Sequence, residues 1–360
     1  MTGILALFSD NINSDIYKYL GIMTHRGNSK NYYSDGIRAE IKNFYEGEPT
    51  FLEGPKCVVC CGFKDTKYIC YTGFSVVYDG VIDLDYFKNV TNPLKSIERL
   101  IDESNDKFFG IYISESELYA FKDKTGSKPG MYGLNSEGKL VICSEDLGFN
   151  KTDDIYGGEI FHVKDDLITR NGGNKKVKPN IYEFLFFSRN ISNIYNVNVG
   201  EFKYNLSKIL VENFKQSFNV VLSTCENTRL MGLTIANLLK VPYIEPKIIP
   251  IYRKKYTPNT DKYQFSDIHF KYDNVLIVDL FIASGKTAKF FVDTYKKHNC
   301  SNITFLSLSP KDKIPDIGPK EIDKENLLNS DKAEEYIGCN IIYNTEENLK
   351  NASGFEEISY

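Results

Sequence analysis

The stretch VLIVDLFIASGKTAKFF spans residues 275–291 and constrains the fold more than any other part of the sequence. Val275–Asp279 is a short apolar run that predicts a buried strand, and the pattern from about Lys286 to His298 predicts a helix. The first N–H groups of a helix have no partner within the helix, and small residues let an anion approach them. We therefore expect a phosphate site formed by the loop residues Ala283, Ser284, Gly285, Lys286 and Thr287.

The type of phosphate site depends on the residues just before this loop. A nucleotide-binding P-loop, G-x-x-x-x-G-K-T, requires glycine at position 280, where this chain has Leu280. A different arrangement uses an acid at the strand end, here Asp279, to hold ribose hydroxyls while the loop amides bind a 5-phosphate. The same pattern also fits a strand–loop–helix corner that binds no ligand.

The remaining sequence predicts two kinds of architecture. After residue 180, strand-like and helix-like runs alternate, as in Val220–Ser223 followed by Thr228–Lys240, which favours a parallel sheet with helices on both faces. Before residue 170, short apolar or alternating runs separated by turn residues predict stacked antiparallel sheets. Helices are expected at about Ser14–Met23 and Leu94–Asp102, and the polar run at 171–180 is the expected domain boundary.

The composition narrows the classes of function. A chain of 360 residues suggests two domains, and a net charge of −4 argues against a nucleic-acid partner. No apolar run reaches the length of about 18 residues needed to span a membrane, and the start of the chain lacks the features of a secretory signal. We expect a cytoplasmic protein without a membrane partner.

Eight cysteines are present, and Cys57 and Cys60 have the C-x2-C spacing of some zinc or redox sites. They lie in KCVVCCGF, which reads as a strand, and no second cysteine or histidine pair completes a ligand set. The sequence therefore predicts reduced structural thiols and no metal site.

The loop resembles the phosphoribosylpyrophosphate (PRPP) loop of the glutamine PRPP amidotransferases, which has two acids followed by S-I-V-R-G-T-T. Asp279, Ile282, Gly285 and Thr287 match this pattern, whereas Leu280 replaces the second acid. A leucine side chain cannot accept a hydrogen bond from a sugar hydroxyl. The resemblance thus implies a PRPP site in which one ribose contact is lost.

Further segments resemble the same family, in the same order along the chain. THRGNSKNYYSDGI is similar to its H-R-G-x-x-S-x-G-I segment, FKDKTGSKPGMYG to its F-R-D-x-x-G-x-R-P-L run, and YIGCNIIYNTEENLKNA to its closing I-G-A-D-S-L-x-Y-L segment. The resemblance implies a class-II glutaminase domain of the N-terminal-nucleophile, αββα type at residues 1–175. A type I phosphoribosyltransferase α/β domain is expected at residues 176–360.

The groups that the resemblance implies for glutamine hydrolysis are altered. Thr2 stands where the family has its cysteine nucleophile, and Asp79 and Gly80 stand at the oxyanion segment, where the family has Asn-Gly. An ionised Asp79 would repel a developing negative charge that an amide would stabilise. The arginine expected near residues 60–75 is absent, and Lys64 or Lys67 could supply only a point charge.

The resemblance also assigns expectations to the transferase half. Arg253, Lys254 and Lys255 resemble the mobile K-N-R-Y segment that folds over PRPP, although the same residues also fit a solvated basic loop. Thr228 and Arg229 stand near the expected pyrophosphate loop. Mg²⁺ is a possible companion of PRPP, and no iron–sulfur cluster is expected, because the cysteines of this half lack the C-x2-C pairing.

The first functional hypothesis is an impaired amidophosphoribosyltransferase relative linked to purine nucleotide biosynthesis. It would bind PRPP or a purine nucleotide and act as a regulatory or structural subunit with an active paralogue, in a homo- or hetero-oligomer. One alternative is an active PRPP-dependent transferase that uses free ammonia or has altered specificity. Another is a hydrolase of a different amide, with Thr2 as an N-terminal nucleophile once Met1 is removed.

Overall fold

The computed structural model describes residues 2–8, 12–27, 30–43, 56–62, 67–146, 149–165, 167–248, 263–300, 302–315 and 327–360. The chain divides into two compact units. The first consists of Met1–Glu183, Phe187–Val199 and Phe355–Ser359, and the second of Phe184–Phe186, Gly200–Gly354 and Tyr360. The first unit thus includes a short segment from near the end of the chain.

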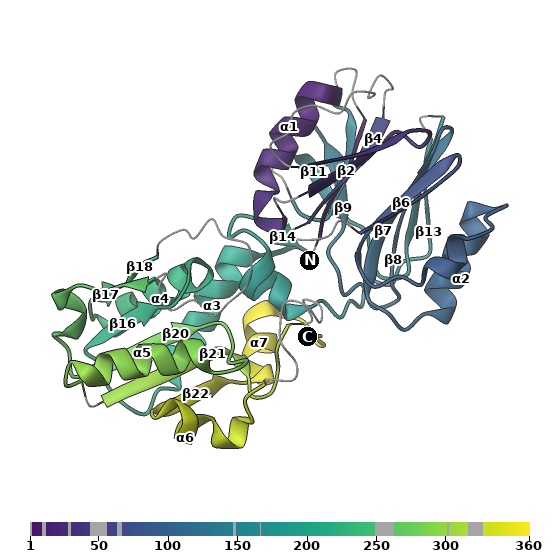
Figure 1. Cartoon of the computed structure of the whole chain (residues 1–360). Helices are drawn as coiled ribbons and strands as arrows, with labels where there is room; N and C mark the ends of the chain where they lie inside the picture. The colour runs from purple at the N-terminus through teal and green to yellow at the C-terminus, as the bar shows by residue number, and fades with distance from the viewer. Residues whose placement is uncertain are drawn as a thin grey trace. The chain divides into compact units, whose positions relative to one another are not determined.

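Two antiparallel sheets form the centre of the first unit (Figure 1). The seven-stranded sheet has the order β11 (Asn150–Asp154), β9 (Met131–Leu134), β10 (Leu140–Cys143), β1 (Thr2–Phe8), β4 (Lys56–Gly62), β2 (Lys30–Ser34) and β3 (Ala39–Asn43). The six-stranded sheet has the order β13 (Leu167–Asn171), β12 (Ile160–Lys164), β8 (Glu117–Lys122), β7 (Phe108–Ser114), β6 (Phe74–Gly80) and β5 (Tyr68–Tyr71).

The central strands are apolar on both faces because both faces are covered. In β1, Leu5 and Leu7 pack with α1 (Ile12–Ile22), while Ile4 and Ala6 pack against the second sheet. Successive side chains of a strand point to opposite faces, so a strand buried on both sides reads as a continuous apolar run. This packing makes the unit a four-layer αββα arrangement, as expected from the sequence.

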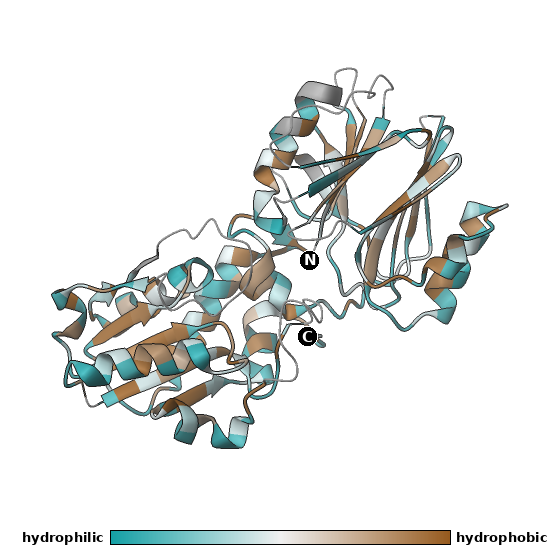
Figure 2. Ribbon diagram, viewed as in Figure 1, coloured by the Kyte–Doolittle hydropathy of each residue, from teal (hydrophilic) through white to brown (hydrophobic). Residues whose placement is uncertain are grey.

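The helix α2 (Pro93–Glu103) covers the outer face of the six-stranded sheet. Asn92 caps it by accepting a hydrogen bond from the Lys95 N–H at 3.1 Å, and Pro93 occupies the first turn. Apolar residues at helical spacing face the sheet, and Figure 2 shows the contrast between the two sides of this helix. Both helices predicted in this half are confirmed.

The C-x2-C pair lies on β4, and its alternation separates the two thiols. Cys57 belongs to the apolar cluster on the α1 side of the sheet, whereas Cys60 belongs to the cluster between the sheets. Burial raises the pKa of both thiols. Two side chains on opposite faces of one strand cannot bind the same metal ion. The strand therefore explains this spacing without a metal site.

A connecting segment follows the two sheets. It contains the π-helix Glu183–Phe187, the hairpin strands β14 (Asn193–Ile194) and β15 (Val197–Asn198), and the helix α3 (Val199–Glu212). Tyr195 and Asn196 both have positive φ at the tip of the hairpin. Such a pair is typical of a type I′ turn, whose twist matches that of the flanking strands.

A five-stranded parallel sheet forms the centre of the second unit. Its order is β17 (Tyr243–Ile244), β16 (Val220–Ser223), β20 (Asn274–Asp279), β21 (Asn302–Pro310) and β22 (Asn340–Asn344). A separate ribbon pairs β18 (Lys247–Ile248) with β19 (Tyr263–Gln264). Because the strands are parallel, all of their carboxyl ends lie at one edge, which confirms the predicted α/β architecture.

Helices cover both faces of this sheet. The helices α5 (Lys286–Lys297) and α6 (Ala333–Ile337) share an apolar cluster with Ile277 and Phe305 on one face. On the opposite face, Gly232 of α4 (Glu226–Leu239) lies so close to the strand that an added Cβ would be 2.2 Å from the Ser223 Oγ. The remaining helical elements are Thr24–Arg26, Leu84–Phe87, Asp267–Phe270, Ser330–Lys332 and α7 (Glu346–Ser353). Over the described ranges, no helix has the length and apolarity required to cross a membrane.

Candidate functional site

The first candidate site lies where β1 begins and β6 ends. The Thr2 backbone N–H donates a hydrogen bond to Asp79 Oδ1 at 2.9 Å, and both residues are buried. The structure therefore brings together the nucleophile and oxyanion positions, which are 77 residues apart in the sequence. Among the described residues, no hydrogen-bond partner reaches Thr2 Oγ1. No described side chain is thus placed to take a proton from this hydroxyl.

Gly80 is required by its backbone conformation and its surroundings. Its φ is +95°, and a Cβ added at this position would lie 2.0 Å from the Lys107 carbonyl oxygen. The next residue, Val81, donates its N–H to the same carbonyl at 3.0 Å. The Gly80 carbonyl accepts a hydrogen bond from Lys67 Nζ at 2.5 Å. Lys67 therefore places a cation at the site, whereas Lys64 lies outside the described residues.

A buried lysine connects Asp79 to a second carboxylate. Lys128 Nζ lies 3.7 Å from Asp79 Oδ2 and 3.5 Å from Glu183 Oε1, and its side chain is 8% exposed. Burial alone would raise the pKa of Asp79, but the positive charges around it, first that of Lys128, outweigh burial and hold this pKa at about 2. Asp79 is therefore a carboxylate at neutral pH, held close to a cation.

Arg26 extends the same buried cluster. Its Nη2 donates to Glu183 Oε2 at 2.9 Å and to Ser188 Oγ at 2.8 Å, while its Nε donates to Glu145 Oε2 at 2.5 Å. Glu145 also pairs with His25 Nε2 at 2.6 Å. Burial opposes the charged guanidinium, but the two glutamates raise the pKa of Arg26 above its ordinary value. We call Arg26, Asp79, Lys128, Glu145 and Glu183 the buried ion cluster.

Sequence reasoning did not assign Lys128, Glu145 or Glu183 to this site. Lys128 lies in FKDKTGSKPGMYG, which resembles a segment of the family, and Glu145 lies in LVICSEDLGF, just after the apolar run Leu140–Cys143. The available signal was a charged side chain within a run that otherwise reads as buried. The signal does not identify the partners, because Lys128 and Glu145 come from separate loops, after β8 and β10, and Glu183 comes from the connecting segment.

A second buried pair in this unit predicts a dependence of stability on pH. Burial is the largest cause of both shifts: it lowers the pKa of Lys122 to about 8 and raises that of Asp154 from 3.8 to about 6. Because the folded state holds the Asp154 proton more tightly, its contribution to stability is complete below pH 3.8 and is lost as the pH rises through about 6. The shift corresponds to about 3 kcal/mol.

The matching variant is Asp154→Asn, which cannot ionise. Between pH 4 and pH 7, we expect the free energy of unfolding of the natural chain to fall relative to this variant by up to about 3 kcal/mol. Urea unfolding at both pH values measures this difference. An unchanged difference between the two proteins would contradict a raised Asp154 pKa.

The second candidate site lies at the carboxyl edge of the parallel sheet, where β20 ends and α5 begins. Asp279 is the last residue of β20, and its Oδ1 accepts the Leu280 N–H at 2.8 Å. Gly285, at the helix N-cap, has a φ of +70°. Within the described part of the chain, no acceptor takes up the backbone N–H groups at the start of α5. These groups are available to an anion.

Leu280 and Ala283 fix the conformation of this loop. The Leu280 side chain is only 5% exposed and packs in the protein interior. The resemblance would place a sugar-binding acid at this position. The Ala283 carbonyl accepts the Leu328 N–H at 2.9 Å. A Cβ added to Gly285 would lie 2.6 Å from Leu328 Cδ2, the end of a flexible side chain, so the positive φ is the stronger reason for glycine here. Ser284, Lys286 and Thr287 complete the loop at partly or fully exposed positions.

The end of β16 lies beside this loop. The Thr224 N–H donates to the Val278 carbonyl at 3.1 Å, and Cys225 is the N-cap of α4. Burial, followed by the charge of Asp279, raises the pKa of the Cys225 thiol to about 11. Cys225 and Asp279 thus lie within electrostatic reach at the edge where ligands bind in such sheets. The thiol is protonated at neutral pH and is not a ready nucleophile.

The basic residues expected near pyrophosphate are placed as follows. Arg229 forms ion pairs with Glu245 at 3.0 Å and with Glu226 at 2.5 Å, so its charge is already paired. Thr228 is buried, and its hydroxyl donates to the Cys225 carbonyl. Arg253, Lys254 and Lys255 lie outside the described residues, and their role stays a prediction.

Searches against known proteins give a consistent result. No protein-family model matches the chain. Amidophosphoribosyltransferases of Pasteurella multocida and Escherichia coli are each 23% identical to it, over 68% and 65% of the chain and 55% and 53% of their own lengths. The Schizosaccharomyces pombe enzyme is 22% identical over 77% of the chain and 61% of its own length. The chain thus spans about half the length of the first two relatives.

Solved structures extend the similarity to the whole fold. Glutamine PRPP amidotransferase from B. subtilis, in complex with ADP and GMP, superposes with a TM-score of 0.77 at 15% identity, covering 98% of this chain and 92% of that one. A structure described as the allosteric regulatory enzyme of purine biosynthesis gives 0.76 at 16% identity, covering 98% and 91%. The chain has the fold of the glutamine PRPP amidotransferases and is distantly similar to amidophosphoribosyltransferases in sequence. The predicted pair of glutaminase-type and phosphoribosyltransferase-type folds is thereby confirmed.

The similarity to amidophosphoribosyltransferases is the reason for considering these two sites together. By the sequence resemblance, Thr2 and Asp79 are expected at a glutaminase-type centre and the loop after Asp279 at a PRPP-type loop. The structure shows the Thr2 N–H bonded to Asp79, and the strand–loop–helix turn from Asp279 to Lys286. The departures from the family pattern are in side chains: Thr2, Asp79 and Leu280.

Proposed function

We propose that this protein is an amidophosphoribosyltransferase-like protein of purine nucleotide biosynthesis that does not hydrolyse glutamine by itself. In this proposal it binds PRPP or a purine nucleotide at the loop after Asp279 and acts as a regulatory or structural subunit with an active, cysteine-bearing paralogue. The observation that carries the proposal is the buried carboxylate of Asp79, which accepts the Thr2 N–H at 2.9 Å and stands where the resemblance expects an oxyanion-stabilising amide.

The electrostatics of this position oppose acyl chemistry. The tetrahedral intermediate of amide hydrolysis develops a negative charge that needs hydrogen-bond donors already in place. When ionised, Asp79 offers only acceptor oxygens to the reacting group. Lys128 lies 3.7 Å from Asp79 Oδ2, so its positive charge is already offset by the Asp79 carboxylate and stabilises a new negative charge less. Thr2 adds a hydroxyl in place of a more nucleophilic thiol.

Glutamine turnover tests the proposal directly. We expect the purified full-length chain to release no ammonia from glutamine above the rate without protein, while an active family member in the same assay does so. Steady ammonia release by this chain alone would contradict the proposal. Native mass spectrometry with the paralogue tests the subunit role, which predicts a complex of defined stoichiometry.

The open loop at Asp279 favours a second candidate, an active transferase that takes free ammonia. Mg²⁺ would arrive with the pyrophosphate of PRPP, and Asp279 is a described carboxylate at the end of the adjoining strand. In the described ranges, no group of three or more metal-binding side chains could hold the ion alone. Release of pyrophosphate from PRPP, with ammonia and Mg²⁺ but no glutamine, would favour this candidate over the regulatory one.

A third candidate uses Thr2 as the nucleophile of another amide hydrolase. The placement of Thr2 beside Asp79 favours it, but the reaction requires a free amine on Thr2 as the base. An intact mass that includes Met1 would exclude this candidate.

A further inference from the structure

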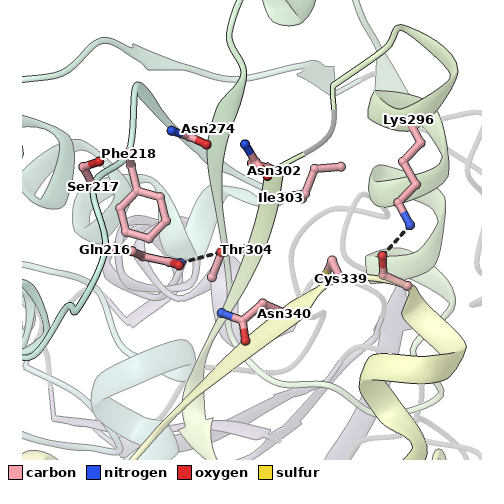
Figure 3. Close-up of a pocket in the computed structure, with 11 residues that line it drawn as sticks. Gln216, Ser217, Phe218, Asn274, Lys296, Asn302, Ile303, Thr304, Cys339 and Asn340 are labelled. Carbon is pink, nitrogen blue, oxygen red and sulfur yellow. Dashed lines mark hydrogen bonds between the residues drawn. The ribbon is translucent and has the colours of Figure 1, made fainter.

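The second unit contains a hollow at the edge of its sheet opposite to the PRPP-type loop. It has a volume of about 400 Å³ and lies where β20, β21 and β22 begin (Figure 3). Each of these strands contributes its first residue to the lining, and in each case that residue is an asparagine: Asn274, Asn302 and Asn340. We call this hollow the amide pocket.

The register of the strands places these side chains on one face of the sheet. Asn274 is paired with Asn302, and Thr304 is paired with Asn340. Asn302 and Thr304 are two residues apart on β21, so their side chains point to the same face. This is the face opposite to α5, because Ile303 and Phe305, which alternate with them, pack against that helix. The asparagines and Thr304 thus share one face, whereas Ile303, Lys296 and Cys339 line the pocket from the α5 side of the same sheet edge.

Residues before β16 complete the lining. Gln216 Nε2 donates to Thr304 Oγ1 at 2.6 Å, which fixes one carboxamide against the sheet, as Figure 3 shows. The ring of Phe218 lies beside it and is 6% exposed. Lys296, near the end of α5, is the one charged residue among the lining residues that the structure describes, and its Nζ donates to the Gly338 carbonyl.

This lining selects for a particular ligand chemistry. A carboxamide offers both donors and an acceptor, and pairs of such groups match the edge of a nucleobase. No carboxylate belongs to the described residues that line the pocket, which disfavours cations, and the Lys296 ammonium already has a partner, which lessens its attraction for a phosphate. The volume lies in the range of small-molecule sites.

We propose that the amide pocket is a binding site for an uncharged nucleoside. The site is separate from the PRPP-type loop, because Asn274 and Asp279 are at opposite ends of β20, about 17 Å apart for an extended strand. The helix α5 connects the two places, since Lys286 begins it at the loop and Lys296 lies near its end at the pocket. The proposal does not depend on whether the chain turns over PRPP.

Isothermal titration of the full-length chain with adenosine, guanosine, cytidine and uridine tests the proposal, with ribose as the sugar-only probe. We expect at least one nucleoside to bind with one-to-one stoichiometry and ribose alone to bind at least tenfold more weakly. Absence of binding of all four nucleosides at about 1 mM would overturn the proposal. Equal binding of ribose would overturn the assignment to a nucleoside.

Variants assign the binding to the pocket. Asn302→Ala and Asn340→Ala remove carboxamides at exposed strand starts, so we expect both to fold and each to weaken nucleoside binding at least tenfold. Asn351→Ala, at an exposed position of α7 outside the pocket, is the matched control and should bind as the natural chain does. Asp279→Ala should also leave nucleoside binding unchanged. Binding that survives both pocket variants, or that is lost with Asp279→Ala, would contradict the proposed location.

Discussion

Replacing Arg26 by methionine is expected to destabilise the first unit by about 3 to 5 kcal/mol, the cost of breaking a buried ion pair by removing one partner. Arg26 is fully buried, and its removal would leave Glu145 and Glu183 without their closest cation. Methionine retains much of the side-chain length, so the loss reports mainly on charge. The melting temperature of the first unit, measured by calorimetry, should fall by about 6 to 20 °C.

The matched control is Arg38→Met, in the same unit. Arg38 pairs with Asp35 at 3.2 Å, but its side chain is 48% exposed, so solvent screens the pair. Its replacement should cost less than about 1 kcal/mol. Similar losses for the two variants would mean that the buried ion cluster does not stabilise the unit. Lys128→Met, which removes the other cation of the cluster, provides a second variant if Arg26→Met does not fold.

The sequence predicts the elements of this fold because their signals are local. The helix α2 is predicted by the helical spacing of its apolar residues and by the asparagine and proline at its start. The run Val275–Asp279 and the glycine at position 285 define a strand, a loop and a helix start within a few residues of one another. Each of these features depends on neighbours along the chain, which a single sequence contains.

The groups that define the chemistry are less accessible to such reasoning. The low pKa of Asp79 depends on Lys128, which comes from a loop some 50 residues away, and on its burial. The sequence shows that Arg229 is a basic residue near the predicted pyrophosphate loop, but it does not show that Arg229 pairs with Glu245. Residue type and spacing predicted where charges lie along the chain, whereas their partners are set by packing.

The same limit applies to the amide pocket. Asn274, Asn302 and Asn340 are isolated in the sequence, and each fits a polar residue at a strand start. Only the parallel register places Asn274 beside Asn302 and Thr304 beside Asn340. A pattern spread over three strands becomes a surface only when the order of the sheet is known.

Asp279→Ala is expected to abolish the stabilisation of the second unit by PRPP with Mg²⁺. If the dissociation constant is about 10 μM, PRPP at 1 mM stabilises the protein by about 2.7 kcal/mol, which raises the melting temperature of a unit of this size by several degrees. By its resemblance to the family loop, Asp279 is the remaining acid for the ribose hydroxyls, since Leu280 is buried and apolar. Thermal shift with and without ligand measures the effect.

The control is Asp293→Ala, which lies on α5, the helix that follows the loop. Asp293 pairs with Lys289 at 3.2 Å and is about half exposed, so its loss should leave the PRPP shift intact. Asp279→Asn separates two contributions, because an amide oxygen can still accept the Leu280 N–H while the negative charge is gone. Loss of the shift in both Asp279 variants would assign PRPP binding to the carboxylate, whereas an undiminished shift in Asp279→Ala would place PRPP elsewhere on the chain.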